Sequence, residues 1–132
     1  MTSLRNKVFG IMGAVVGLTA FQANAAEEVN VYSLRQPFLI EPMFKQFTQE
    51  TGIRVNTLLS TSGLGERIKH EGRNSPADLL LTVDIGRIQD AVDADIATPL
   101  QSDVIDANIP EQFRDQDHLW VGLTTRARVL YT

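Results

Sequence analysis

Polar and charged side chains follow three predicted strands, at the points where those strands end. Arg35 and Ser62 each come shortly after a segment that reads as a strand, and Asp84 ends the apolar run 79–83. Open α/β sheets place their ligand crevice outside the carboxyl ends of the strands. These residues are therefore candidates for contacting a small ligand at one edge of a sheet.

Two arginines suit an oxyanion. The guanidinium group of Arg35 is a permanent cation with a forked set of donors, which fits a carboxylate, carbonate or phosphate oxygen. Arg126 and Arg128 lie at the start of a predicted strand, and one of them can face a cleft. The alternative is that Arg35 is an ordinary surface charge.

Ser62 and Asp84 each precede a predicted helix. The turn 60–63 has three hydroxyl side chains, and the N–H groups at the start of a helix favour an anion. The alternative for both residues is an ordinary helix cap, because Ser and Asp are preferred at that position. Tyr32, at the end of the first strand, is either a phenolate donor or a half-buried strand residue.

The order of the elements predicts an α/β fold with a mainly parallel sheet. The run 79–83 is expected to be a strand covered on both faces, because it is almost wholly apolar. Pro42 allows the first helix proper to start near Glu41. The expected strands are 29–33, 53–59, 79–83, 119–123 and 127–131, and the expected helices are 38–51, 64–71, 87–95 and a short helical or irregular piece, 100–108.

The first helix should bury one apolar stripe, because its apolar residues recur at the spacing of a helix face. The residues of the stripe are Ile40, Met43, Phe44 and Phe47. The piece 100–108 has Ser102 and Asp103 as possible caps.

Residues 1–25 have the features of a secretory signal peptide. Arg5 and Lys7 precede the apolar stretch 8–21, and Ala23-Asn24-Ala25 is a small-x-small cleavage site. Cleavage would remove two cations and no acid, which changes the net charge from −4 to −6 and leaves 107 residues. This negative charge argues against a nucleic-acid or anionic-membrane partner. An exported chain without cysteine must be held by its core, without disulfides.

No common enzyme signature is present. The sequence has no phosphate-binding glycine loop with its lysine, no G-x-S-x-G and no H-E-x-x-H, and His70 and His118 stand apart from any catalytic pattern. The prediction is therefore a binding protein rather than an enzyme.

Several motifs together resemble the periplasmic ferric-iron-binding proteins of ABC transporters. The resemblance runs along the whole mature chain, and its most specific part is a Tyr-Ser-x-Arg opening combined with Ser-Pro-Ala-Asp before an apolar strand. The motifs are Val31-Tyr32-Ser33-x-Arg35, Phe47-Thr48-x-x-Thr51-Gly52-Ile53-x-Val55, Arg67-Ile68-Lys69-x-Glu71-Gly72, Asn74-Ser75-Pro76-Ala77-Asp78 and Leu123-Thr124-x-Arg126-Ala127-Arg128-Val129.

The resemblance implies a type II periplasmic binding protein with two hinged lobes, residues 26–132 forming the N-terminal lobe. It implies ferric iron as cargo, a synergistic anion such as carbonate or phosphate, and delivery to the membrane permease of an ABC transporter by a periplasmic monomer. Arg35 and Arg126 match family positions. The family holds its iron chiefly with two adjacent tyrosines from the second lobe.

This sequence departs from the family in its first-lobe ligands. Many relatives have His-Tyr directly after Tyr-Ser-x-Arg, where this chain has Gln36 and Pro37. Tyr32 and Gln36 remain only weak candidates for contacting a metal. In another branch a glutamate stands where this chain has Val83, followed by Asp84.

The sequence is therefore expected to be an N-terminal fragment that cannot hold ferric iron tightly alone, since the tyrosine pair is absent. The alternative is a binding protein of the same fold for another oxyanion or a small organic solute.

Overall fold

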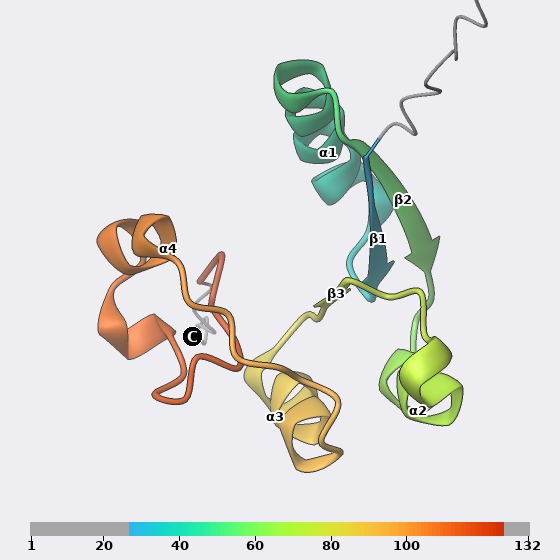
Figure 1. Ribbon diagram of the computed structural model, residues 1–132, viewed down its shortest axis with the longest axis vertical. Coiled ribbons are helices and arrows are strands. Elements are labelled where there is room, and N and C mark those ends of the chain that lie inside the picture. The colour runs from blue at the N-terminus through green and yellow to red at the C-terminus, as the bar shows by residue number, and fades with distance from the viewer. Residues whose placement is uncertain (1–26, 126–132) are drawn as a thin grey trace, which may run out of the picture.

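The computed structural model describes residues 27–125, and Figure 1 shows the arrangement of their helices and strands. Its centre is a three-stranded parallel sheet in the order β2-β1-β3. The strands are β1 (Glu28–Ser33), β2 (Arg54–Leu59) and β3 (Leu79–Leu81). The predicted α/β class with a parallel sheet is confirmed.

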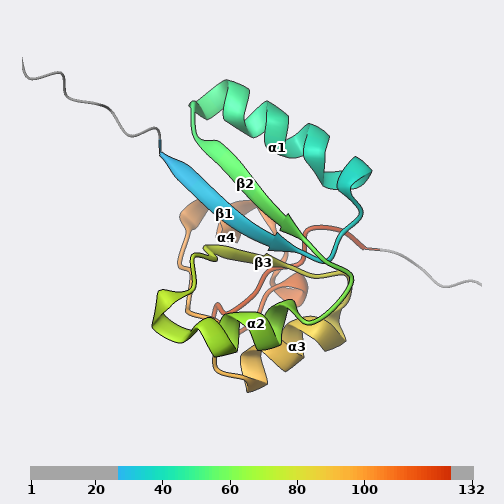
Figure 2. The ribbon, with the colours of Figure 1, turned by 90° about the vertical axis from the view of Figure 1, so that its right-hand side faces the viewer.

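Within residues 27–125, four α-helices and two 3-10 turns connect and follow the strands. The helices are α1 (Pro37–Thr51), α2 (Leu64–Glu71), α3 (Ile85–Asp93) and α4 (Asp103–Asn108), and the turns are η1 (Gly72–Asn74) and η2 (Glu111–Phe113). In Figure 2, α1 runs alongside β2 on one side of the sheet, and α2 and α3 lie on the opposite side. None of the helices in residues 27–125 combines the length and the apolar character needed to cross a membrane.

Helix α1 begins earlier than Pro42 suggested. Pro37 occupies its first turn, where a missing N–H costs nothing, and Gly52 closes it in the left-handed conformation with φ 77°. Pro42 lies inside the helix rather than near its start. The carbonyl that loses its partner belongs to Phe38 in the first turn, which is open to water, so the helix tolerates the proline.

The core of the described part is small, and the predicted stripe of α1 is only partly covered. Ile40 is buried, but Met43 is 48% exposed and Phe47 is 39% exposed. The helix contacts the edge strand β2, so only the residues directly over the strands are shielded from water. The buried apolar residues are Val31, Tyr32, Ile40, Leu64 and Ala91.

Strand β3 differs from its prediction in length and in burial. It ends at Leu81, and Leu79 is 53% exposed, so the strand is not covered on both faces. Within the described residues it pairs only with β1, which makes it an edge strand. Thr82 ends it by donating its hydroxyl to the carbonyl of Asp84 over 3.2 Å.

The Ser-Pro-Ala-Asp segment fixes the register of β3 against β1. The carboxylate of Asp78 accepts the backbone N–H of Asn30 at 2.8 Å, and the N–H of Asp78 donates to the carbonyl of Asn30 at 2.9 Å. Pro76 precedes the strand and needs no ladder partner. The motif therefore has a structural role that its sequence alone did not reveal.

The predicted strand 119–123 is wrong. The structure has there a single antiparallel bridge between Arg114 and Val121. The carboxylate of Asp115 accepts the N–H groups of Asp117 and Leu119, which tightens the chain into a turn instead of an extended ladder. The predicted strand 127–131 lies outside the described residues.

The prediction for 100–108 is confirmed in its helical form. Helix α4 starts after Ser102, whose hydroxyl accepts the N–H of Ile105 at 3.4 Å.

Candidate functional site

The carboxyl ends of all three strands meet at one place, as the sequence predicted. The N–H of Ser60, just after β2, donates to the carbonyl of Ser33 at 3.1 Å. The N–H of Leu34, just after β1, donates to the carbonyl of Leu81 at 2.8 Å. The loops that carry Arg35, Ser62 and Asp84 therefore leave the sheet from the same edge.

Arg35 is partly exposed in the loop between β1 and α1. Its backbone N–H donates to the hydroxyl of Ser33 at 3.1 Å. The ion pairs between described residues involve other arginines, so no carboxylate in this part of the chain neutralises its guanidinium group. A partly exposed cation whose backbone is held in place is suited to contact an anion.

Ser62 is exposed in the loop between β2 and α2, but it is not the cap of that helix. The cap position belongs to Gly63, at φ 77°, and no side chain bonds to the first turn. Ser60 organises the loop by donating its hydroxyl to the carbonyl of Ser62 at 2.7 Å. The ordinary serine cap considered from sequence is therefore wrong, and the role of Ser62 toward an anion remains a prediction.

Asp84 caps α3, which confirms the alternative considered for it. Its carboxylate accepts the N–H of Arg87 at 3.0 Å and lies 3.8 Å from the Nε atom of the same residue. A carboxylate engaged in this way can still offer its second oxygen to a ligand, and this role stays a prediction.

Arg87 is a residue of this edge that the sequence analysis missed. Its Nη1 atom donates to the carbonyl of Thr61 at 3.3 Å, so it joins the loop after β2 to the start of α3. The signal in the sequence was an arginine three residues after a capping aspartate. That spacing alone does not reveal the contact with Thr61, which comes from a loop 26 residues earlier.

Tyr32 and Gln36, the weak candidates for contacting a metal, make hydrogen bonds within the protein. Tyr32 is 4% exposed, and its hydroxyl lies 3.1 Å from each carboxylate oxygen of Glu71. Gln36 is exposed at the cap position of α1, where its carbonyl accepts the N–H of Leu39 at 3.0 Å.

Glu71 is the centre of a polar cluster that joins β1 to the end of α2. Besides Tyr32, it accepts the Nε–H of Arg67 and the hydroxyl of Ser75, both at 2.7 Å. The guanidinium carbon of Arg67 lies 5.5 Å from the centroid of the Tyr32 ring. Hydrogen bonds from Arg67, then Ser75 and Tyr32, hold the pKa of the Glu71 carboxyl below its ordinary value.

This cluster predicts a pH dependence of stability. Because the folded pKa of Glu71 is lowered, its contribution is present above its unfolded pKa, near 4.3, and is lost as the pH falls through the folded value. Glu71→Gln should have a clearly lower free energy of unfolding than the natural chain at pH 7. This difference between the two proteins should narrow towards about pH 3. Urea unfolding at both pH values measures it.

Glu66→Gln is the matched control, because Glu66 is an exposed acid in the first turn of the same helix. It should change the free energy of unfolding little at either pH. A gap for Glu71→Gln that is equally wide at both pH values would contradict the role given to the carboxylate.

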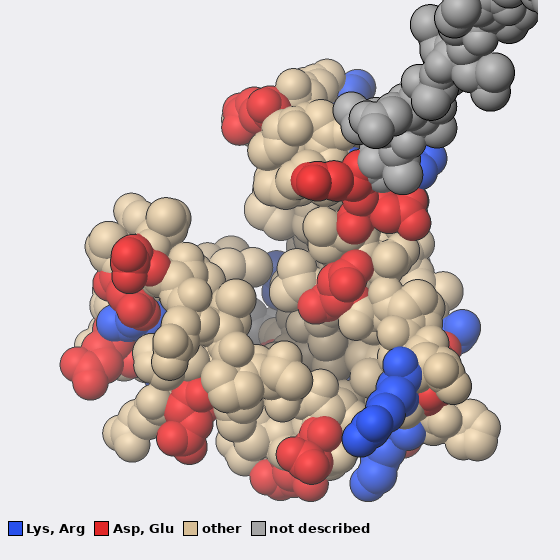
Figure 3. All heavy atoms as spheres, in the orientation of Figure 1, with Lys and Arg blue, Asp and Glu red and all other residues tan. Residues whose placement is uncertain are grey.

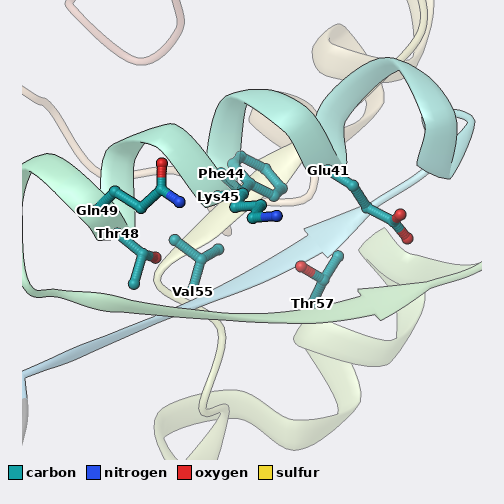
Figure 4. A pocket seen from close by; sticks show the side chains of 7 residues that line it. All are labelled: Glu41, Phe44, Lys45, Thr48, Gln49, Val55 and Thr57. Atoms are coloured by element: carbon teal, nitrogen blue, oxygen red, sulfur yellow. The ribbon is translucent and has the colours of Figure 1, made fainter.

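Two hollows of the surface do not coincide with these residues. One, of about 440 Å³, lies between α1 and β2 and is drawn in Figure 4. A second, of about 250 Å³, lies between α4, η2 and the segment 122–125. Arg35, Ser62 and Asp84 line neither of them.

The surface gives two further facts about possible ligands. On the face drawn in Figure 3, acidic side chains are scattered over every part, and the surface is hollowed between the part that carries α4 and the part that carries α1. Within residues 27–125, no three His, Asp or Glu side chains come together to hold a metal ion. Arg126 lies outside the described residues, so its position relative to Arg35 stays a prediction.

Comparisons with known proteins show which family this chain resembles. The family described as "Bacterial extracellular solute-binding protein" matches residues 32–132. Iron uptake protein A1 of Synechocystis sp. is 46% identical over 105 residues, which are 79% of this chain and 29% of the relative. The Fe(3+)-binding periplasmic protein of Serratia marcescens is 31% identical over 117 residues, or 85% of this chain and 34% of the relative.

Solved structures share the fold. The apo ferric ion-binding protein A of Pasteurella haemolytica has a TM-score of 0.75 and 58% identity, and the match covers 78% of this chain and 32% of that one. Trichodesmium IdiA (FutA), solved in complex with iron and citrate, has a TM-score of 0.68 and 40% identity, covering 72% and 30%. The chain thus spans about a third of the length of the proteins that it matches.

Proposed function

The chain belongs to the family of bacterial extracellular solute-binding proteins, and we propose that it is the solute-binding component of a ferric iron ABC transporter. Relatives named for iron uptake and for Fe(3+) binding support ferric iron as the cargo. The observation that carries the proposal is the meeting of three strand ends around Arg35, whose guanidinium group has no carboxylate partner among the described residues.

In this proposal residues 26–132 form the first lobe of a two-lobed protein and contribute the anion contacts. Arg35 and Arg126 bind two oxygens of a carbonate or phosphate ion, and Ser62 donates its hydroxyl to a third. Asp84 faces the ligand with the carboxylate oxygen that its cap leaves available. Ferric iron needs hard oxygen donors, and such an anion supplies some of them.

The chain by itself is proposed to hold ferric iron weakly. Its sequence contains only two tyrosines, Tyr32 and Tyr131, which are not adjacent. The hydroxyl of Tyr32 is already bonded to Glu71 inside the protein. The tyrosine pair expected from the family resemblance would therefore have to come from another part of a longer protein.

Location and partners follow from the same proposal. The protein is exported with residues 1–25 as its signal peptide and works as a periplasmic monomer. It delivers its cargo to the permease of the transporter, reaches the membrane only through that permease, and catalyses no reaction. The net charge of −4, which becomes −6 without residues 1–25, supports a partner other than nucleic acid.

Calorimetric titration of the chain with ferric citrate, followed in parallel by visible absorbance, tests the proposal. We expect no submicromolar iron site and no phenolate-to-iron charge-transfer band in this chain. Titration with inorganic phosphate should show a site that weakens as the salt concentration rises, because surface charges are screened by salt. A submicromolar ferric site would contradict the proposed division of the ligands.

A further inference from the structure

Ser33 is the one buried polar residue that residues 27–125 contain, and it lies at the end of the central strand. Its exposure is 0%, whereas its neighbours in the next loop are partly or fully exposed. A serine hydroxyl buried in this way costs free energy unless it has hydrogen-bond partners. Its contacts therefore indicate what it does.

The contacts of Ser33 reach two of the three loops at this edge. Its hydroxyl oxygen accepts the N–H of Arg35 at 3.1 Å, and its carbonyl accepts the N–H of Ser60 at 3.1 Å. The next residue, Leu34, donates to Leu81 in β3 at 2.8 Å. The pair 33–34 is therefore the junction through which the three strand ends are held in register.

Strand β1 is also held in place at the residue before Ser33, which is Tyr32. The hydroxyl of Tyr32 is bonded to Glu71 at the end of α2. With Tyr32 fixed on one side and Ser60 on the other, the backbone at Ser33 has little freedom to shift. The hydroxyl of Ser33 is then the group that decides where the following turn begins.

We propose that Ser33 is a positioning residue that aims Arg35 at the oxyanion, a role that rests on the proposed function of Arg35. Its hydroxyl closes a two-residue turn by accepting the N–H of Arg35, a local bond that serine side chains form readily. Ser33 itself is fully buried, and the hydrogen bond to the N–H of Arg35 is partly buried. Without the Ser33 hydroxyl, the N–H of Arg35 loses its hydrogen-bond partner, and the backbone of Arg35 is no longer held in one position.

The experiment compares Ser33→Ala with a matched control, Thr51→Ala. The hydroxyl of Thr51 likewise accepts the N–H two residues later, from Ile53 at 3.1 Å, but Thr51 lies at the end of α1, before the amino end of β2. Two measurements are made on the full chain. One is the hydrogen exchange of the Arg35 amide by NMR, and the other is the affinity for inorganic phosphate.

In Ser33→Ala the Arg35 amide should exchange about tenfold faster, and phosphate affinity should fall by about five- to tenfold, as expected for one lost hydrogen bond. Thr51→Ala should change neither quantity. In an Arg35→Met background, Ser33→Ala should cause no additional loss of phosphate affinity. This last result distinguishes positioning of Arg35 from a general loosening of the fold, which would lower affinity in either background.

The possible failures can be told apart. Unchanged exchange of the Arg35 amide in Ser33→Ala overturns the proposal, and so does an equal loss of affinity with and without Arg35. If the natural chain binds no phosphate, the anion site of the proposed function fails and Ser33 has no ligand for which to aim Arg35, so the positioning role falls with it. Faster exchange of the amide in that case would still locate the failure at the anion site rather than at the hydrogen bond.

Discussion

Arg35→Met is expected to lower the affinity for inorganic phosphate by about 10- to 100-fold, the range expected when a hydrogen bond to a charged group is lost. The methionine side chain keeps much of the length of arginine and removes its charge and its forked donors. The phosphate affinity of Arg35→Lys should fall between those of the natural chain and Arg35→Met, because an ammonium group keeps the charge without the planar pair of donors. NMR titration at fixed ionic strength measures all three.

Arg54→Met provides the control for the charge change. Arg54 is also an exposed arginine, but it lies at the amino end of β2 and pairs with Glu28 at 2.9 Å, at the opposite end of the sheet. Its substitution should leave phosphate affinity within about twofold, since exposed ion pairs contribute little. An equal loss for Arg54→Met and Arg35→Met would show that net charge, and not a site at Arg35, controls the binding.

Ile40→Ala is expected to lower the free energy of unfolding by about 2–5 kcal/mol, as is usual for removing a large buried aliphatic side chain. Ile40 is 4% exposed and is the one residue of α1 that is fully buried. Because the described part buries so few apolar side chains, this loss is a large share of a typical stability of about 5–15 kcal/mol. Urea unfolding at pH 7 measures it.

Leu39→Ala tests whether the effect comes from burial. Leu39 is the neighbour of Ile40 in the same helix and is 52% exposed. Its substitution should change the free energy of unfolding by less than about 1 kcal/mol, because surface substitutions usually have small effects. Equal losses at both positions would mean that the outer face of α1 is covered in solution.

The sequence predicted well those parts of the fold that depend on local pattern. The bounds of α2 agree exactly with its prediction, and β1 and β2 differ from theirs by one residue each. The signals were the alternation of apolar residues and the glycines that follow α1 and α2. These signals lie within a few residues of the element that they define.

The errors have a common physical origin in contacts with residues outside the predicted segment. The apolar run 79–83 predicts burial, but burial depends on what lies beside β3, and Leu79 is half exposed. Segment 119–123 is mostly apolar, like a buried strand, yet the carboxylate of Asp115 bends the chain before a ladder can form. Neither the neighbours of a strand nor a competing side-chain contact can be read from its own residues.

The same distinction holds for the candidate site. The rule that ligands bind at the carboxyl ends of strands predicted where Arg35 and Ser62 lie. It could not predict the contact of Arg87 with Thr61, or the bonding of Tyr32 to Glu71, because these pairs are 26 and 39 residues apart. Tyr32 illustrates the limit: its type suggested a phenolate donor, and only the fold revealed its hydrogen-bond partner.

The hydrogen bonds between Asn30 and Asp78 have a consequence for how the chain folds. The two residues are 48 positions apart, whereas β1 and β2 are joined by contacts 26 positions apart, such as that between Glu28 and Arg54. Closing the longer loop costs more chain entropy, and distant contacts slow the crossing of the folding barrier. The β1-α1-β2 unit is thus the expected nucleus, and β3 docks last, when the Asp78 carboxylate reaches a strand that is already in place.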